Sequence, residues 1–319
     1  MINFIQQIND WSKQRIPFLF VIDFELKSPL AYRLSDLDPN EILYDVNGIS
    51  NAPVQTPAAH SLVFERSPIS FQDYHRKFQV VAGALHQGES YLTNLTIPTP
   101  VVMNISLREL FFAAKAKYKL WFRNEFLVFS PESFIRIENG KIFSFPMKGT
   151  IDASVHNARQ IILNDEKEKA EHVTIVDLIR NDLSLVADRV AVNRFRYVDE
   201  LKTSSHTLLQ VSSEISGDLK PNLALGDLLI KLLPAGSISG APKKRTVQII
   251  QQAEQQPRGY FTGVFGIFDG ARVDSGVMIR FIENMPQGFM YRSGGGITGQ
   301  SDAEQEYKEA INKVYAPVY

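Results

Sequence analysis

Short hydrophobic stretches of the β type recur along the chain, and two dipeptides that favour tight hairpins lie among them. Asn139-Gly140 stands between Phe134–Ile137 and Lys141–Phe145, and Asp269-Gly270 follows Phe261–Phe268. Both dipeptides tolerate the positive φ angles of the turns that join neighbouring antiparallel strands. Antiparallel sheets are therefore predicted. Further strands are predicted at Phe18–Phe24, Ser61–Glu65, Leu120–Ser130, Ser275–Ile282 and Gly288–Ser293.

Segments with the spacing of amphipathic helices lie between these strands. Apolar residues recur at helical spacing from Phe71 to Leu85, and Gly88 follows as a stop signal. Because helices and strands interleave, mixed α and β structure is predicted. Four further helices are predicted at Asp165–Leu185, Leu225–Leu233, Lys243–Glu254 and Asp302–Tyr315.

The length of the chain suits one large folded unit. It has 319 residues, of which 44% are hydrophobic, and single cores stop growing at roughly 250–300 residues. We therefore predict a single domain, 1–319, built from two packed layers. Residues 1–60 are predicted to form a short β segment with a surface loop at Asn47–His60, and residues 71–315 the core that carries the chemistry.

Charge and hydropathy argue against two classes of partner. Lys and Arg total 34 against 35 Asp and Glu, a formal charge of −1, so no broad basic surface is expected for nucleic acid. The apolar runs, such as Phe18–Ile22 and Leu228–Leu233, are far shorter than the roughly 20 residues of a membrane-spanning helix. The first residues lack the pattern of a signal peptide. A cytoplasmic protein with no membrane or nucleic-acid partner is expected.

Two segments contain a lysine beside glycine or proline. Lys148 and Gly149 follow a strand broken by Pro146, and alone they would be an ordinary surface turn. The segment Leu233–Arg245 resembles a phosphate loop, but it lacks the Gly-x4-Gly-Lys-Ser/Thr spacing. A nucleoside-triphosphate site is therefore excluded.

Carboxylates and glycines recur at positions suited to ligand binding. Glu171 lies at the start of an amphipathic helix, and Glu306, Glu309 and Lys313 share one face of another. Each helix alone would be explained by solvated, salt-bridging residues. Gly294–Gly296 follow a strand and could present consecutive amides to an anion, as in a backbone nest.

Taken together, these segments resemble the chorismate-utilising enzymes, which include anthranilate, aminodeoxychorismate, isochorismate and salicylate synthases. The similarity runs from roughly Phe71 to Lys313 in one fixed order. The matching blocks are Ser130–Phe134, Pro146–Thr150, Glu171-His172, Val176–Leu183, Thr207–Ser213, Pro234–Lys243, Arg258-Gly259 with Gly263, Ile279-Arg280, Gly294–Gly296 and Glu306–Glu309.

The resemblance implies a fold and a metal. The expected fold is an α/β (α+β) sandwich of two large, mostly antiparallel β-sheets packed face to face, with helices outside and the active site between the sheets. Glu171, Glu306 and Glu309 are expected to hold Mg²⁺, which binds the ring carboxylate of chorismate. Hard carboxylate ligands suit this ion, and the chain has no cysteine to favour a softer metal.

The resemblance also implies how the substrate is held. Arg280, expected to project from the strand Ser275–Ile282, matches the arginine that forks onto the enolpyruvyl carboxylate. Lys313 and the amides of Gly294, Gly295 and Gly296 would complete the binding site for the dianion. The remaining expected substrate-binding residues are Gly149 and Thr150.

The residue at position 148 distinguishes the branches of the family. Anthranilate synthases carry alanine here and aminodeoxychorismate synthases carry lysine, so Lys148 implies 4-amino-4-deoxychorismate as product. Lys148 would attack ring carbon 2 and is expected to have a lowered pKa. Glu132 would protonate the departing 4-hydroxyl and is expected to have a raised pKa. Leu92 stands where isochorismate and salicylate synthases have a lysine that activates water.

The ammonia for this reaction must be supplied by another protein or taken from solution. The glutaminase partner of such enzymes uses a cysteine nucleophile, and this chain has no cysteine, so a separate glutaminase subunit or free ammonia is implied. Phe261 and Gln210 depart from residues found in some relatives, which often have tyrosine and histidine there. The alternatives are an anthranilate synthase large subunit and a non-catalytic chorismate-binding relative.

Overall fold

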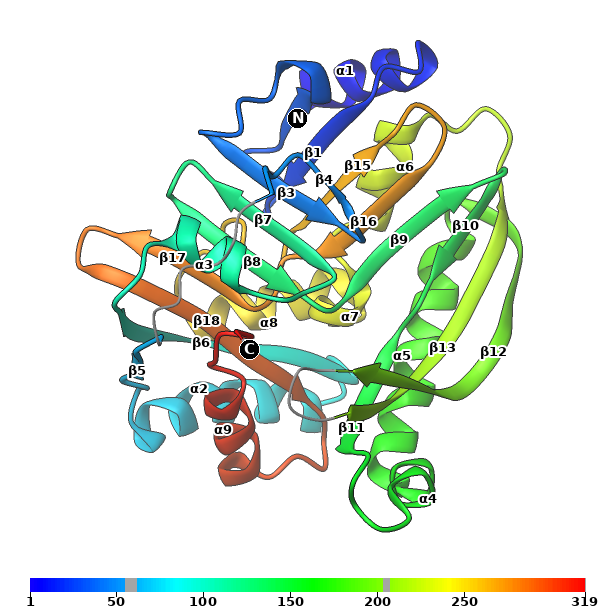
Figure 1. Ribbon diagram of the computed structural model, residues 1–319. Helices are drawn as coiled ribbons and strands as arrows, with labels where there is room; N and C mark the ends of the chain where they lie inside the picture. The colour runs from blue at the N-terminus through cyan, green and yellow to red at the C-terminus, as the bar shows by residue number, and fades with distance from the viewer. Residues whose placement is uncertain (55–61, 203–206, 319) are drawn as a thin grey trace.

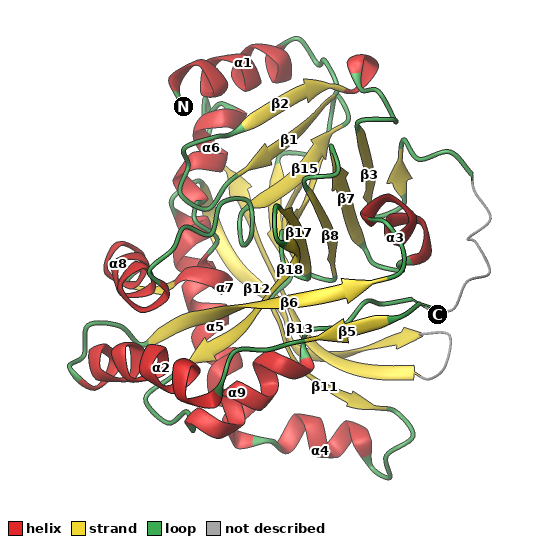
Figure 2. Cartoon of the chain, turned by 90° about the vertical axis from the view of Figure 1, so that its left-hand side faces the viewer, coloured by secondary structure: helices red, strands yellow, loops and turns green. Residues whose placement is uncertain are grey.

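The computed structural model describes residues 1–54, 62–202 and 207–318. Within these ranges the strands form two nine-stranded sheets, A and B, and all their pairings are antiparallel. The sheets face each other, and helices cover their outer sides (Figures 1 and 2). The predicted sandwich of two antiparallel sheets is confirmed.

Both sheets draw strands from widely separated parts of the chain. Sheet A has the order β11 (Met147–Asp152), β13 (Thr207–Leu219), β10 (Lys141–Ser144), β9 (Ser133–Glu138), β16 (Val273–Val277), β15 (Val264–Phe268), β1 (Phe18–Ile22), β2 (Leu30–Arg33), with β12 (Ala187–Lys202) also pairing with β13. Sheet B has the order β14 (Gly240–Ala241), β6 (Leu92–Met103), β18 (Gly288–Ile297), β17 (Phe281–Met285), β8 (Phe126–Ser130), β7 (Tyr118–Phe122), β3 (Ile42–Val46), β4 (Ile49–Ser50), with β5 (Phe64–Arg66) also pairing with β6.

The helices cover the outer faces of the sheets. Helix α5 packs along β12 and β13, whereas α2, α8 and α9 gather against β6 and β18 (Figure 1). No helix in the described ranges is both long and apolar enough to cross a membrane. The helices are α1 (Ile2–Lys13), α2 (Phe71–His86), α3 (Leu107–Ala113), α4 (Ala158–Asn164), α5 (Glu166–Ser184), α6 (Leu225–Leu232), α7 (Gly236–Ser239), α8 (Lys243–Glu254) and α9 (Ala303–Asn312), with a 3₁₀ turn at Leu34–Asp36.

Strand β1 shows why the sandwich has separate hydrophobic layers. Successive side chains of a strand point to opposite faces of the sheet. Leu19 and Val21 accordingly join the cluster between the two sheets, whereas Phe18, Phe20 and Ile22 join the cluster outside sheet A. All five are fully buried, so this strand is apolar on both faces.

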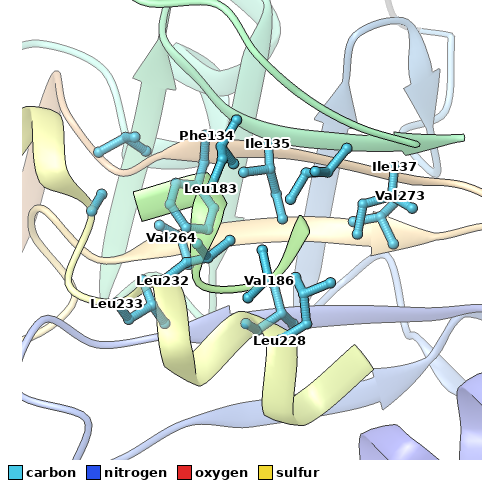
Figure 3. Packing of buried hydrophobic residues seen from close by; sticks show 14 of the residues in the cluster. Phe134, Ile135, Ile137, Leu183, Val186, Leu228, Leu232, Leu233, Val264 and Val273 are labelled. Atoms are coloured by element: carbon cyan, nitrogen blue, oxygen red, sulfur yellow. The ribbon is translucent and has the colours of Figure 1, made fainter. Parts of the chain in front are cut away.

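The cluster outside sheet A is closed by α5 and α6. Figure 3 shows Ile135 of β9 and Val264 of β15 facing Leu183 of α5 and Leu228 and Leu232 of α6. All five side chains are at most 2% exposed. The packing therefore fixes the position of the α5 helix, whose N-terminal half carries Glu171, against sheet A.

The chain passes from one sheet to the other several times, and two of these connections are short and adjacent. Strand β8 of sheet B continues through Pro131 and Glu132 into β9 of sheet A, and β16 of sheet A continues through Met278–Arg280 into β17 of sheet B. The amide of Phe129 donates to the Arg280 carbonyl at 3.1 Å, and the amide of Val277 donates to the Glu132 carbonyl at 3.1 Å. These bonds hold Glu132 and Arg280 side by side at the junction of the sheets.

The predicted strand Ser275–Ile282 is therefore wrong as a single element. Arg280 has a φ of +53°, a left-handed conformation that ends one strand before the next begins. The chain turns here because β16 pairs in sheet A and β17 pairs in sheet B. Arg280 lies at this crossing and does not project from a continuous strand.

The predicted hairpins are confirmed. Asn139 and Gly140, with φ angles of +51° and +73°, join β9 to β10, as expected for a type I′ turn. Asp269–Arg272 join β15 to β16. The predicted stretch Leu120–Ser130 is a third hairpin, with β7 and β8 joined at Arg123 and Asn124.

The predicted N-terminal β segment is present as β1–β4, but a helix that was not predicted precedes it. The chain begins with α1, whose Phe4 and Ile8 are buried one helical turn apart. The Asn9 side chain fastens α1 to α6, because its amide donates to Asp227 at 2.8 Å and its carbonyl accepts from the Gly226 amide at 2.7 Å. The predicted loop Asn47–His60 begins at the turn between β3 and β4, but positions 55–60, like Ser61, lie outside the described residues.

Candidate functional site

A cavity of about 770 Å³ lies where the two sheets, α5 and α9 meet. Sheet A contributes β11, sheet B contributes β6 and β18, and the two crossings contribute Glu132 and Arg280. This volume is typical of small-molecule sites. Every residue singled out from the sequence lines it: Glu132, Lys148, Gly149, Thr150, Glu171, Arg280, Gly294, Gly295, Gly296, Glu306, Glu309 and Lys313.

Glu132 is the buried carboxyl of the cavity. Its Oε1 accepts a hydrogen bond of 2.6 Å from the hydroxyl of Ser237, at the start of α7. Burial raises the pKa of Glu132, although Ser237 and the charges of Lys148, Lys313 and Arg280 oppose the change. The prediction of a raised pKa is confirmed.

Lys148 extends from β11 towards α5. A bulge at Gly149, which has a φ of +74°, separates Lys148 from Thr150 in the pairing with β13. The Lys148 Nζ donates to Glu171 Oε2 at 2.7 Å. The loop-like break predicted at Pro146 is thus a bulged edge strand, and the bulge re-aims the lysine.

The pKa of Lys148 contradicts the prediction. Burial is the largest single influence and alone would lower the pKa, but the charge and hydrogen bond of Glu171 and the charges of Glu168 and Glu309 together outweigh it. The net effect raises the pKa of Lys148 above its ordinary value. The prediction of a lowered pKa is therefore wrong, because the neighbouring charges are negative.

The predicted metal ligands line one side of the cavity, each with a partner inside the protein. Glu306, which is 3% exposed, accepts from the Ser301 hydroxyl at 2.7 Å. Glu309 accepts from Lys313 Nζ at 2.6 Å, and Glu171 accepts from Lys148. Among the described residues, no three acidic or histidine side chains already form a metal-sized cluster.

The chemistry of these donors nevertheless suits a hard divalent cation. They are carboxylate oxygens, and the chain has no cysteine to compete. Glu168 adds a fourth carboxylate to the same wall. Burial and its neighbours Glu171 and Glu309 raise the pKa of Glu168, against the pull of Lys148. The wall therefore has an excess of acidic groups that a cation can neutralise.

The Gly294–Gly296 run permits three different close approaches. A Cβ atom at Gly294 would lie 2.2 Å from the Leu95 carbonyl oxygen, and one at Gly295 would lie 3.2 Å from Glu309 Oε1. A Cβ at Gly296 would lie 3.0 Å from Leu92 Cδ1. The run belongs to the regular strand β18, so its amides point alternately to either side and do not form the predicted nest.

Arg280 and Lys313 supply positive charge to the cavity. The Arg280 guanidinium packs over the ring of Tyr315 at 5.1 Å, and its buried Nε has no hydrogen-bond partner among the described residues. Lys313 Nζ donates to the Gly294 carbonyl at 2.9 Å. A buried donor without a partner is costly, and a carboxylate of a ligand can provide the missing acceptor.

A family model described as chorismate binding enzyme matches residues 25–318. The chain belongs to this family. Among its relatives, an "Uncharacterized PabA-like protein" of Haemophilus influenzae is 49% identical over 320 residues, covering 100% of this chain and 97% of that protein. The family thus agrees with the resemblance seen in the motifs of this chain.

Relatives with named activities are more distant. The aminodeoxychorismate synthase component 1 of Salmonella typhimurium is 33% identical and covers 82% of this chain. The anthranilate synthase component 1 of Archaeoglobus fulgidus is also 33% identical and covers 75%. The matches span 60% and 58% of those two proteins. The menaquinone-specific isochorismate synthase of Escherichia coli, 16% identical, shares the fold with a TM-score of 0.75 over 98% of this chain and 79% of its own.

Two notable cavity residues, Ser237 and Glu168, were not singled out from the sequence. Ser237 lies within a matching block, but a serine beside glycine gives no sign of its bond to Glu132. Glu168 lies one helical turn before Glu171, and that spacing could have revealed it. Leu92 does line the cavity, as its predicted position requires.

His172 explains how α5 presents Glu171 to the cavity. Its Nε2 lies 2.6 Å from the Ser213 hydroxyl of β13, so the ring fastens the helix to sheet A. Burial, with the charges of Arg196 and Lys148, lowers the pKa of His172 to about 4. The ring is neutral at physiological pH, and the adjacent Glu171 projects towards Lys148.

Proposed function

We propose that this chorismate-binding enzyme converts chorismate and ammonia to 4-amino-4-deoxychorismate. The observation that carries the proposal is the pairing of two groups in one cavity: the amine of Lys148 and the buried carboxyl of Glu132, whose pKa burial raises. A nucleophile and a general acid are the two groups needed to replace the 4-hydroxyl, which is a poor leaving group.

In the proposed reaction, the neutral Lys148 amine bonds to ring carbon 2 while the 4-hydroxyl takes a proton from Glu132 and leaves as water. Ammonia then bonds to carbon 4, and the bond between Lys148 and carbon 2 breaks. The proton lost by each attacking nitrogen passes to the departing group or back to Glu132. The sum is chorismate plus ammonia giving the 4-amino product plus water.

The other cavity residues would hold the substrate. Arg280, whose buried Nε lacks a partner among the described residues, suits the enolpyruvyl carboxylate. Glu171, Glu306 and Glu309 would hold Mg²⁺. When bound, the ion supplies positive charge for the ring carboxylate and offsets the carboxylates that keep Lys148 protonated. The Gly294–Gly296 strand and Lys313 would lie beside the two carboxylates of the substrate.

Removing divalent cations should abolish turnover. Four carboxylates, those of Glu168, Glu171, Glu306 and Glu309, line the side of the cavity where the ring carboxylate of the substrate is proposed to bind. Without a cation, these carboxylates should repel the dianionic substrate. We expect chorismate consumption to stop after dialysis against EDTA and to return on addition of Mg²⁺ in excess. Full activity after exhaustive chelation, with metal content checked by mass spectrometry, would remove the ion from the mechanism.

The purified chain should use ammonium but not glutamine. It has no cysteine for the nucleophilic step that releases ammonia from glutamine, so a separate glutaminase subunit would supply ammonia. Mass analysis of the product from chorismate, Mg²⁺ and ammonium should show 4-amino-4-deoxychorismate. A fluorescent aromatic product would favour anthranilate synthesis, the activity named for the Archaeoglobus relative. Turnover of glutamine by this chain alone would contradict the separate subunit.

A further inference from the structure

A buried ion pair lies directly behind the cavity wall. Arg258 and Glu254 are 2% and 4% exposed. The guanidinium binds the carboxylate through two bonds, from Nη2 to Oε1 at 2.6 Å and from Nε to Oε2 at 3.0 Å. Arg258 also packs over the ring of Phe24 at 4.8 Å. Neither charged residue lines the cavity, so neither can contact a ligand there.

The pair is bonded to the strand that carries the cavity wall. Glu254 Oε1 accepts from both the amide and the hydroxyl of Thr96 at 2.9 Å. Arg258 Nη2 donates to the Asn94 carbonyl at 2.8 Å. Asn94 and Thr96 line the cavity, and they are the register partners of Gly296 and Gly294. The ion pair therefore holds the backbone opposite the glycine strand.

The same guanidinium reaches the loop before β15, which is bonded to the segment that leads to Arg280. Its Nη1 lies 3.3 Å from the hydroxyl of Thr262, a cavity residue with a φ of +61°. This conformation is a strained one for a β-branched residue. The Thr262 amide donates to the Met278 carbonyl at 2.8 Å, two residues before Arg280. One arginine thus contacts both the glycine side and the Arg280 side of the cavity.

Stability alone is a weak explanation for such a pair. A buried Arg–Glu pair loses much of its Coulombic energy to desolvation, and well-packed apolar replacements are often equally stable or more so. Apolar replacements could not, however, bind the Thr96 amide, the Asn94 carbonyl and the Thr262 hydroxyl together. The contacts that distinguish this pair from an apolar core are those it makes with cavity-wall residues.

We propose that Glu254 and Arg258 are positioning residues, which hold the Asn94–Thr96 and Thr262 walls of the cavity at the spacing that receives chorismate. They act through Asn94, Thr96 and Thr262 and do not touch the substrate. The proposal rests on the location of the cavity and on the family's substrate. It does not depend on which product this enzyme forms.

The test separates positioning from stability by replacing both charges at once. The double variant Glu254→Leu/Arg258→Met removes the pair without leaving a single buried charge. We expect it to unfold near the temperature of the unchanged protein, but to lose about 100-fold in kcat/KM for chorismate consumption, the loss that a misplacement of roughly 1 Å can cause. We expect most of the loss in KM, with weaker chorismate binding by calorimetry and faster amide exchange in β6 and β18.

Two further variants keep the test decisive. Arg258→Lys retains the charge beside Glu254 but cannot form the planar fork, so it should stay folded and still raise KM if the double variant fails to fold. Leu110→Ala is the control for lost stability. Leu110 is a fully buried residue of α3 in a hydrophobic cluster that does not line the cavity, so its replacement should lower the unfolding temperature and leave KM unchanged.

The outcomes are distinguishable. If the double variant is as stable as the unchanged protein and retains its KM, or if Arg258→Lys retains it, the pair is structural and the proposal is overturned. Because chorismate consumption and binding are measured, whatever the product, an error in the assigned product would leave this result intact.

Discussion

Replacing Lys148 with alanine is expected to reduce formation of the 4-amino product by orders of magnitude while chorismate still binds. The substitution removes the proposed nucleophile but leaves Arg280 and the carboxylates of α5 and α9 in place. An interaction made only along the reaction path lowers kcat and kcat/KM together, with little change in ground-state binding. Product formation is measured by mass spectrometry and chorismate binding by calorimetry.

The unchanged enzyme should also yield a covalent adduct on Lys148 when chorismate is present and ammonia is withheld. Intact-protein and peptide mass analysis would locate it, with the Lys148→Ala protein as the control. Lys148→Arg is a matched variant, because it keeps the positive charge beside Glu171 but cannot act as a neutral nucleophile. If Lys148→Ala formed the 4-amino product at the wild-type rate, Lys148 would at most position the substrate. The main argument for this product over anthranilate would then be lost.

Replacing Glu132 with glutamine is expected to lower kcat by about 10²–10⁴-fold, the usual contribution of a general acid. Glutamine has nearly the same shape and can still accept the bond from Ser237, but it cannot donate a proton to the leaving hydroxyl. In the unchanged enzyme, activity should fall as pH rises through the raised pKa of Glu132. That falling limb should be missing from the residual activity of the variant.

The same substitution should raise the stability of the folded protein at neutral pH. A carboxyl whose pKa is raised by folding stabilises the protein below its unfolded pKa, and this contribution is lost as pH rises through the folded pKa. Burial raises the pKa of Glu132, so above the ordinary pKa of a glutamate the folded protein bears a cost, either of binding a proton or of burying a charge, that glutamine avoids. Thermal unfolding at several pH values should show a higher Tm for Glu132→Gln at pH 7 and no advantage at low pH. A lower Tm at neutral pH would contradict this account.

The elements that could be predicted from the sequence have local causes. The turn at Asn139 and Gly140 was predictable because the dipeptide itself favours the required backbone angles. The helices α2 and α9 were predictable from apolar spacing. The β12 and β13 strands were not, because β12 is an edge strand with many charged residues, such as Arg189, Arg194 and Arg196, and three register shifts near them. Its extended form depends on pairing with β13, which is a tertiary effect.

The same division applies to the site. The residues that line the cavity were found because the resemblance identified their blocks together, although each block alone had an ordinary explanation. The sign of the pKa shift of Lys148 could not be predicted, because it depends on how closely Glu168 and Glu171 approach the amine in space. Arg280 was placed in the wrong kind of element for a related reason. A continuous apolar run predicts one strand, and nothing local marks the change of sheet.

The two adjacent crossings at Glu132 and Arg280 also constrain how the protein can move. Because each crossing ties the two sheets together through a short length of backbone, the sheets cannot slide past each other at this point. A rotation of one sheet against the other would therefore have its hinge at these two crossings. Glu132 and Arg280, at the hinge, would keep their separation. The distance between Lys148 on β11 of sheet A and the glycine run on β18 of sheet B would change.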